Sequence, residues 1–536
     1  MSTERRRRRR GRHESVGGGA ATEALQDLVG QFADPHAFVR ELIQNSLDAG
    51  ASSIEVVMDY ADAILTVAVI DDGSGMDRET IEGYLLTLFR STKEDDLTKI
   101  GKFGIGFVSL FAIGPTQVVV DTGRDSIWLQ VVFAADRSYT LYEKEDPYEG
   151  TTVTLNLERK AKEAQKTCEL IHQSAEKWCR FVDADIFTTA SGIAQGWDAR
   201  LISADFTVDS PMLVQSESDG FLAIMGPSPS PQVGFYCRGL TLWESESPIL
   251  AGVSFKVEGR HLEHTLTRDN VLRNRHYKLV MHRLKAMVND VGKELTDAIV
   301  AAVAEGNYSR VNELFGCVAH EVAWSWDRRV PLIPAVGREP LSINDLAGGL
   351  LGKLWQQVTK GTPLYFGSAD DPLANAVAAS GQTVVVATSK RDPLLAWAVR
   401  WGHKDPQPVA KAFVMALPIE LKPQEQALFE ATKSLVEKHG SSFELFPGEL
   451  LGDALKGRLA LNQTVAYQVD SAEASSLQDR HIVIASNHHL FQELLHLPPA
   501  LGAPLLLRAA LLDAGRTNRP DPDQVVSAAI AALETP

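Results

Sequence analysis

Long apolar runs and cysteines are both scarce in this sequence, and each shortage excludes a class of protein. No apolar stretch approaches the roughly 18 residues that a membrane-spanning helix needs, so we expect no integral membrane contact. The four cysteines form neither a CxxC pair nor a disulfide framework: Cys168, Cys179, Cys237 and Cys317. Their pattern is typical of reduced thiols, which predicts a cytoplasmic protein.

Positive charge is also in short supply, because 53 lysines and arginines face 69 acidic residues and leave a net charge of −16. This balance argues against a main body that wraps nucleic acid. The exception is the segment 1–20, in which Arg5–Arg10 and Arg12 precede three glycines. Such a run predicts a disordered tail, which could touch RNA, an anionic membrane or the acidic body, or serve only solubility. It has no apolar core behind it, so it is not predicted to be a secretory signal.

The length of 536 residues is too great for one hydrophobic core, and the composition is that of a globular protein. Strand-like runs at 52–60 and 63–71, and four more between 116 and 157, have the spacing of an antiparallel sheet. Helical patterns flank them, up to residue 50 and over 159–182. An α+β multidomain protein is predicted, whose first domain is an α/β sandwich with helices on one face of a sheet.

Changes of pattern along the chain predict further parts. The expected division is a tail 1–20, a first domain 21–195, an α/β middle domain 196–330, a small α/β subdomain 331–440 and a mostly helical region 441–536. A helical stretch from about 275 to 304 is expected near the end of the middle domain. The last region contains one strand candidate, "RHIVIAS", at 480–486.

The helix "ELIQNSLDAG" places three polar residues at positions i, i+4 and i+7. With 3.6 residues per turn, Glu41, Asn45 and Asp48 fall on one face. Taken alone, such a row is most often a solvated polar face. Two glycine-rich motifs downstream in the chain favour a functional interpretation instead.

The first motif is "DDGSGM", in which Asp71 ends an apolar strand and Gly73 and Gly75 permit a tight turn. A carboxylate at a buried strand end can accept a hydrogen bond from an exocyclic amine such as that of adenine. Asp-Gly is also a common turn dipeptide, so the motif is weak alone.

The second motif is "GKFGIGF", which places three glycines before a helix, where exposed backbone N–H groups can cradle phosphates. Thr151 opens the strand "TTVTLNL", and its hydroxyl could reach the same pocket.

In this order and spacing, the motifs resemble the nucleotide-binding domain of the gyrase, HSP90, histidine kinase and MutL (GHKL) ATPase superfamily, over residues 22–190. The resemblance implies that Glu41 orients and deprotonates the attacking water and that Asn45 coordinates a Mg²⁺ ion bridging the phosphates of ATP. It also implies that Asp48 supports the water network near the base. Asp71 would read the adenine amine, and Thr151 would share an ordered water there.

The same resemblance implies a second group of ATP-binding residues. Met76 would pack against the adenine ring, beside the turn at Gly73 and Gly75. Arg90 and Lys93 are candidates to neutralise phosphate charge. The phosphates would be lined by Gly101, Lys102, Gly104, Gly106 and Phe107.

Further segments resemble the HSP90 branch, as in a divergent bacterial HSP90-like protein. "IGKFGIGFVSLF" and "GTTVTLNL" are similar to its first domain, and "FKVEGRHLEHTLTRDNVLRN" is similar to its middle segment. By that pattern Arg268 would be a second catalytic residue that reaches the γ-phosphate when the domains close, although a surface salt bridge with Asp269 or Glu263 would also explain it. The segment from "ASNHHLFQELL" onward is similar to the bacterial dimerisation end, which implies a homodimer.

Some features depart from that family. The lid before "GKFGIGF" is short, Lys102 stands where glutamine is common, and the segment 331–480 matches poorly. The resemblance implies an ATP-dependent chaperone, a dimeric clamp that hydrolyses ATP to do conformational work on client proteins. Two alternatives stay open: an HSP90-like switch dedicated to one partner or defence system, and a MutL-like or topoisomerase-like DNA clamp, which would need a basic channel.

Overall fold

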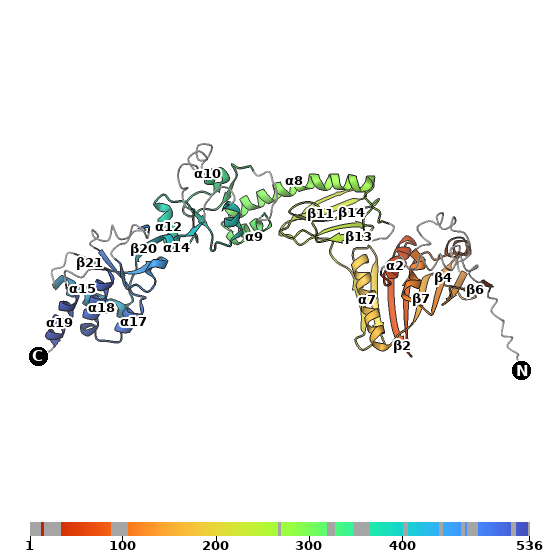
Figure 1. Cartoon of the computed structure of the whole chain (residues 1–536), viewed down its shortest axis with the longest axis horizontal. Helices are drawn as coiled ribbons and strands as arrows, with labels where there is room; N and C mark the ends of the chain where they lie inside the picture. Colours follow the sequence, from red (N-terminus) through yellow and green to blue (C-terminus); the bar gives the residue numbers. More distant parts are fainter. Residues whose placement is uncertain are drawn as a thin grey trace. The chain divides into compact units, whose positions relative to one another are not determined.

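The structure is a computed structural model that describes residues 12–14, 34–86, 106–125, 127–265, 270–318, 327–347, 364–399, 406–438, 443–461, 467–468, 481–515 and 521–533. The chain divides into two compact units, Met1–Val291 and Gly292–Pro536, whose elements are labelled in Figure 1. Among the described residues, no helix has both the length and the apolar character that a membrane crossing requires.

The first unit begins with a sheet that has nine strands within the described residues, in the order β1-β6-β5-β4-β7-β3-β2-β8-β9. Neighbouring strands are antiparallel except for the parallel pair β2 and β8. The strands are β1 (Arg12–Glu14), β2 (Ser53–Ala61), β3 (Ile64–Asp71), β4 (Gln117–Arg124), β5 (Ile127–Ala134), β6 (Tyr139–Lys144), β7 (Gly150–Glu158), β8 (Asp185–Ser191) and β9 (Trp197–Ile202). The antiparallel sheet predicted for β2 to β7 is confirmed, but β1 lies in the segment predicted to be a disordered tail, where it pairs with β6, and β8 and β9 were not predicted as strands.

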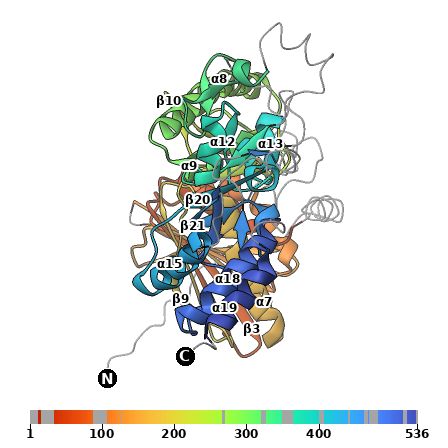
Figure 2. The ribbon, with the colours of Figure 1, turned by 90° about the vertical axis from the view of Figure 1, so that its left-hand side faces the viewer.

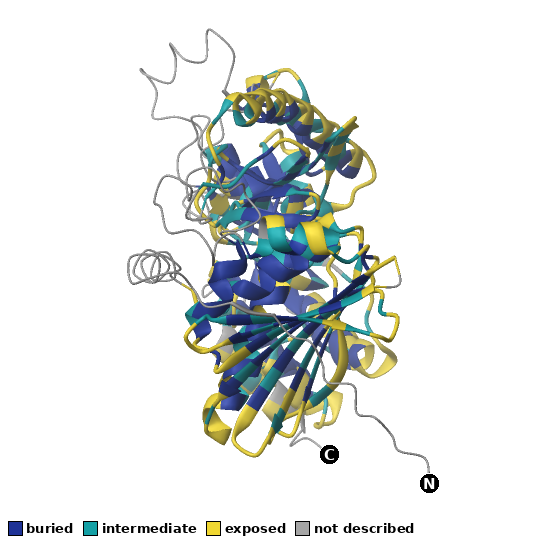
Figure 3. Cartoon of the chain, turned by 90° about the vertical axis from the view of Figure 1, so that its right-hand side faces the viewer, coloured by how far each residue is buried: buried dark blue, intermediate teal, exposed yellow. Residues whose placement is uncertain are grey.

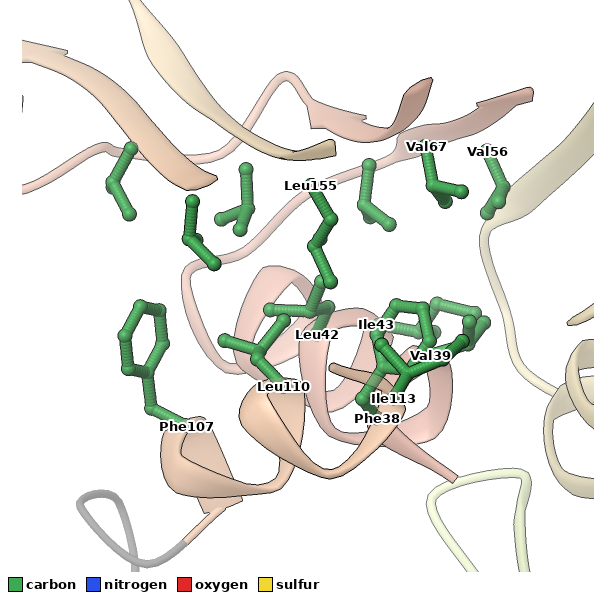
Figure 4. Packing of buried hydrophobic residues seen from close by; sticks show 14 of the residues in the cluster. Phe38, Val39, Leu42, Ile43, Val56, Val67, Phe107, Leu110, Ile113 and Leu155 are labelled. Carbon is green, nitrogen blue, oxygen red and sulfur yellow. The ribbon is translucent and has the colours of Figure 1, made fainter. Parts of the chain in front are cut away.

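Helices cover one face of this sheet, as predicted. They include α2 (Phe38–Asp48), the 3₁₀ turn η2 (Ser109–Ile113) and α7 (Ala161–Cys179). Alternate strand residues are fully buried, and Figure 3 shows these dark-blue positions along the strands. In Figure 4, Val56, Val67 and Leu155 of the sheet lie opposite Leu42 and Ile43 of α2. The core is therefore built from apolar residues that recur every second position in the strands and about every 3.6 positions in the helices.

Two short helical elements follow β3, and residues of both line the cavity described in the next subsection. The turn α3 (Arg78–Thr80) leads into η1 (Ile81–Leu85), a single π-helical turn. Asp77 caps α3, because its side chain accepts a hydrogen bond of 2.7 Å from the backbone N–H of Thr80.

A second sheet in the first unit has the order β10-β11-β14-β12-β13. Its strands are β10 (Val214–Ser218), β11 (Phe221–Pro227), β12 (Val233–Cys237), β13 (Leu240–Ser245) and β14 (Val253–Gly259). The strands β12 and β13 form a hairpin. The predicted helix 275–304 is present as α8 (Arg275–Ala304).

Among the described residues of the second unit, β15 (Pro331–Ile333) and β16 (Leu341–Ser342) form a two-stranded sheet, and two larger sheets follow in the chain. The first is parallel, with the order β18-β17-β19, and its strands are β17 (Tyr365–Gly367), β18 (Val384–Val386) and β19 (Gln407–Pro408). The second has the order β22-β24-β21-β20-β23, and its strands include β20 (Phe413–Pro418), β22 (Ala460–Leu461) and β23 (Tyr467–Gln468). Helices α15 (Pro423–Lys438), α18 (Pro499–Asp513) and α19 (Pro522–Leu533) pack together in this part (Figure 2).

The described residues after 441 contain more strand than the sequence predicts. The expected strand is present as β24 (His481–Ala485), but β21 (Glu444–Leu451) lies beside it in the middle of the sheet. Pro447 and Gly448 gave β21 the local pattern of a turn. Pairing on both sides overrides that pattern, and a Cβ at Gly448 would lie 2.1 Å from Val483 Cγ1, so only glycine fits.

Candidate nucleotide-binding site

A cavity of about 490 Å³ lies between α2 and the adjoining ends of β3, β4 and β7. Predicted site residues that line it are Asn45, Asp48, Asp71, Gly75, Met76, Phe107 and Thr151. The structure thus brings together residues from four separate motifs. Its other lining residues include Leu42, Val69, Val120 and Val153, which give it an apolar interior with few polar groups, as is typical of ligand pockets.

Asp71 is held in place by three hydrogen bonds from three different segments. Its Oδ1 accepts from the backbone N–H groups of Gly73 (3.0 Å) and Thr151 (3.2 Å). Its Oδ2 accepts from the hydroxyl of Ser46 at 2.7 Å. Because a carboxylate can accept about four hydrogen bonds, the anchored group retains acceptor capacity for a ligand amine.

The register of the sheet aligns three polar side chains across neighbouring strands. Asp71 on β3 is paired with Thr151 on β7, and Thr151 is paired with Thr122 on β4. The hydroxyls of Thr122 and Thr151 lie 3.0 Å apart. Thr122 Oγ1 also accepts a hydrogen bond of 2.8 Å from the backbone N–H of Met76, which fixes the glycine turn against β4.

Sequence reasoning missed Ser46 and Thr122. Both are buried, and both sit at positions where the hydrophobic period calls for an apolar residue. In "TQVVVDT" the inward positions are Val118, Val120 and Thr122, so a hydroxyl at the third one was the signal for a polar contact inside. For Ser46 the signal was weaker, since serine commonly bonds the preceding helical turn, and its hydroxyl lies 3.1 Å from the carbonyl oxygen of Leu42.

The turn after Asp71 needs glycine at position 75. Gly75 has φ +62°, and a Cβ there would lie 2.0 Å from the carbonyl oxygen of Gly123. Gly73 passes close to the end of α2, where a Cβ would lie 2.9 Å from that of Ala49. The two glycines thus allow the turn to lie flat against both the helix end and β4.

The polar row on α2 faces a second cavity of about 320 Å³ in the same unit. Glu41, Asn45 and Asp48 all line it, and Asn45 and Asp48 line the first cavity as well. Glu41 is 5% exposed. Burial raises the pKa of Asp48, and the nearby Arg238 guanidinium opposes that rise. All three residues of the predicted row therefore reach the wall of one cavity, which Arg40, Gln44 and Leu47 of α2 also line.

Two arginines that the sequence did not single out reach the two cavities. Arg124, at the end of β4, lines the first cavity and lies 3.8 Å from the carboxylate of Asp77. Arg238, in the β12–β13 turn, lines the second and bonds Asp48. Neither had a sequence signal, because each depends on how separate strands pair or pack.

Several predicted residues lie outside the described part of the chain: Arg90, Lys93, Gly101, Lys102, Gly104 and Arg268. Their roles stay predictions. The end of the phosphate motif is described, and there Gly106 accepts a 2.6 Å hydrogen bond from the hydroxyl of Ser109 while Phe107 is buried against the cavity.

Known proteins resemble the part of the chain that holds this site. Residues 34–168 match the family described as "Histidine kinase-, DNA gyrase B-, and HSP90-like ATPase". The chain is also similar to the chaperone protein HtpG of Chlorobium phaeobacteroides, with 30% identity over 29% of this chain and 30% of that protein. For HtpG of Porphyromonas gingivalis the identity is 26%, over 32% of this chain and 29% of that protein. For HtpG of Mycobacterium bovis the identity is 27%, over 30% of this chain and 29% of that protein.

These alignments are partial. The chain spans about 30% of the length of each of these three relatives. The family match covers Asp71, Thr151 and the whole row on α2, so it coincides with the first cavity.

Proposed function

We propose that the protein binds ATP in the first cavity and hydrolyses it, because residues 34–168 match the histidine kinase, DNA gyrase B and HSP90-like ATPase family. The observation that carries this proposal is the anchored carboxylate of Asp71 in a largely apolar cavity, with Asn45 of α2 on the cavity wall. An apolar cavity with one fixed acceptor suits a flat base that carries an exocyclic amine.

The row on α2 supports an assignment of roles along the helix. Asp48 and Asn45 line the cavity that holds Asp71, and Glu41 lies one turn further along the same face. The Asn45 side-chain oxygen would coordinate Mg²⁺, which would neutralise charge on the phosphates. Glu41 would accept a proton from the attacking water.

We further propose that hydrolysis drives a homodimeric, HSP90-like clamp that acts on client proteins. The similarity to HtpG chaperones supports this proposal. So do three leucines on α18, Leu501, Leu505 and Leu512, which are exposed although large and apolar. Their helical spacing would suit a partner helix in a two-fold bundle. Arg268 would complete the site when the clamp closes.

Steady-state ATP hydrolysis tests the enzymatic part of the proposal. Wild type should turn over slowly, Glu41→Ala should not, and Arg268→Ala should fall at least tenfold, about 1.4 kcal/mol of transition-state stabilisation. Arg268→Ala activity equal to wild type would contradict the shared site. A wild type that binds no ATP would overturn the proposal.

Client work is tested separately by aggregation of an unrelated unfolded protein, with ATP and with Glu41→Ala as control. ATP-dependent suppression by wild type alone supports a chaperone. ATPase activity without suppression favours a dedicated switch, and stimulation of the ATPase by DNA favours the DNA clamp.

A further inference from the structure

We propose that Arg238 is a positioning residue that connects the nucleotide cavity to the second sheet of the first unit through Asp48. The guanidinium Nη1 of Arg238 lies 3.1 Å from Oδ1 of Asp48, 190 residues away in the sequence. Asp48 lines both cavities, so this ion pair joins the β12–β13 hairpin to the wall of the first one. The inference rests on the proposed ATP site and adds a residue to it.

The backbone of Arg238 is in a conformation that arginine disfavours. Arg238 (φ +50°) and Gly239 (φ +75°) form the two-residue turn between the paired residues Cys237 and Leu240. Such turns favour Asn-Gly, and a side chain with an ordinary Cβ costs about 1 kcal/mol in the left-handed region. An arginine at this position therefore contributes something other than turn stability.

The hairpin is fixed relative to the first sheet, so the reach of Arg238 is defined. A Cβ at Gly239 would lie 2.3 Å from the carbonyl oxygen of Phe181, which shows how closely the turn packs on the chain after α7. Thr241 of β13 donates a 3.0 Å hydrogen bond to the carbonyl of Lys177 on α7. Glu244, further along β13, is in contact with Arg180.

The exposure of the pair indicates what it does. The Arg238 side chain is 71% exposed and that of Asp48 is 26% exposed, so the pair adds little to folding stability. Its effect is electrostatic: Arg238 neutralises a carboxylate that lines the cavity where an anionic nucleotide would bind. Without it, Asp48 would repel that ligand. By reciprocity, a nucleotide that binds beside Asp48 would hold the hairpin in place.

Arg260 offers a matched control. It lines the same second cavity, but it pairs with Asp219 at 3.4 Å and not with α2. The variants Arg238→Asn and Arg260→Asn remove one positive charge each from this cavity. Asn is also the residue that the 238–239 turn prefers, so Arg238→Asn should fold at least as stably as wild type.

The test measures ATP binding by calorimetry and amide hydrogen exchange of residues 233–245 with and without ATP. Arg238→Asn should raise the Kd for ATP about three- to tenfold, as expected of a lost ion pair, and abolish the ATP-dependent protection of the hairpin. The Kd of Arg260→Asn for ATP should stay within about twofold of the wild-type value. Arg238→Lys, which keeps the positive charge, should retain most of the wild-type affinity for ATP.

A double-mutant cycle with Asp48→Asn assigns the effect to the pair, because Arg238→Asn should then change the Kd little. Arg238→Asn with unchanged affinity and unchanged hairpin protection would overturn the inference while wild type still binds ATP. Equal losses in Arg238→Asn and Arg260→Asn would also overturn it, since they would show a general effect of charge. A wild type without ATP binding would overturn the proposed function first.

Discussion

The hydroxyl of Ser46 on α2 donates a 2.7 Å hydrogen bond to Oδ2 of Asp71 at the end of β3. Both residues line the first cavity. The bond joins the helix that holds Asn45 to the strand that holds the proposed adenine acceptor, so the two halves of the site share one contact.

Ser46→Ala should weaken ATP binding by about tenfold, because the hydrogen bond that orients a charged acceptor is lost. Asp71→Asn should abolish measurable binding, since the acceptor facing the adenine amine is replaced. Calorimetry measures both. Ser174→Ala is the control: it removes a buried hydroxyl of the same domain that bonds His36 and does not line the cavity. A Ser46→Ala protein with wild-type affinity would contradict the orienting role.

Gly75→Ala should destabilise the first unit more than Gly50→Ala. Both glycines have positive φ, +62° and +78°, so both substitutions cost about 1 kcal/mol of backbone strain. Only Gly75 also brings the new Cβ within 2.0 Å of a carbonyl oxygen, whereas nothing lies within 4 Å at Gly50. The clash should add about 1–3 kcal/mol. Urea unfolding measures the free energy of unfolding of the two variants. Equal losses of this free energy would show that the turn at Gly75 can shift to accommodate a Cβ.

Cys237 should react with a maleimide in the folded protein much faster than the other three cysteines. Cys168, Cys179 and Cys317 are buried, while Cys237 at the end of β12 is partly exposed. Burial also raises the pKa of Cys168 to about 11 and that of Cys179 to about 12, so neither is a thiolate at pH 8. Mass spectrometry of the labelled peptides should find one modified site in buffer and four in guanidinium chloride. Rapid labelling of Cys179 in buffer would contradict the packing of α7.

Acid should destabilise the first unit in part through His172. Burial lowers the pKa of this histidine, Glu176 partly opposes that fall and Arg200 adds to it, and the ring bonds Thr188 at 2.8 Å. The unfolded chain, with a histidine pKa of about 6.5, then takes up the proton first as the pH falls. This part of the stability is complete above that pH and is lost below it, until the folded-state pKa is passed.

Thermal unfolding at pH 7.5 and pH 5.5 measures the effect of that proton. The fall in Tm should be smaller for His172→Gln than for wild type, with the exposed His496→Gln as control. Equal falls in all three proteins would assign the acid sensitivity to other groups.

The strands β2 to β7 of the first sheet could be predicted from the sequence, because their residues alternate between the core and the other face of the sheet. The row of Glu41, Asn45 and Asp48 was predictable for the same reason, since a helical period places these residues on one face. Ser46 and Arg238 were not, because their roles depend on which distant segments pack against them. β21 was missed because its local residues favour a turn and only its neighbours make it a strand.

The alignment of Asp71, Thr151 and Thr122 across three strands has a consequence for how the protein matures. Asp71 and Thr151 are 80 residues apart, so they meet only after long-range strand pairing is complete. A slip of one residue between β3 and β7 would turn one of them to the opposite face. Competence to bind nucleotide therefore arises late in folding, and in a newly made chain it would report that the centre of the sheet has paired in the correct register.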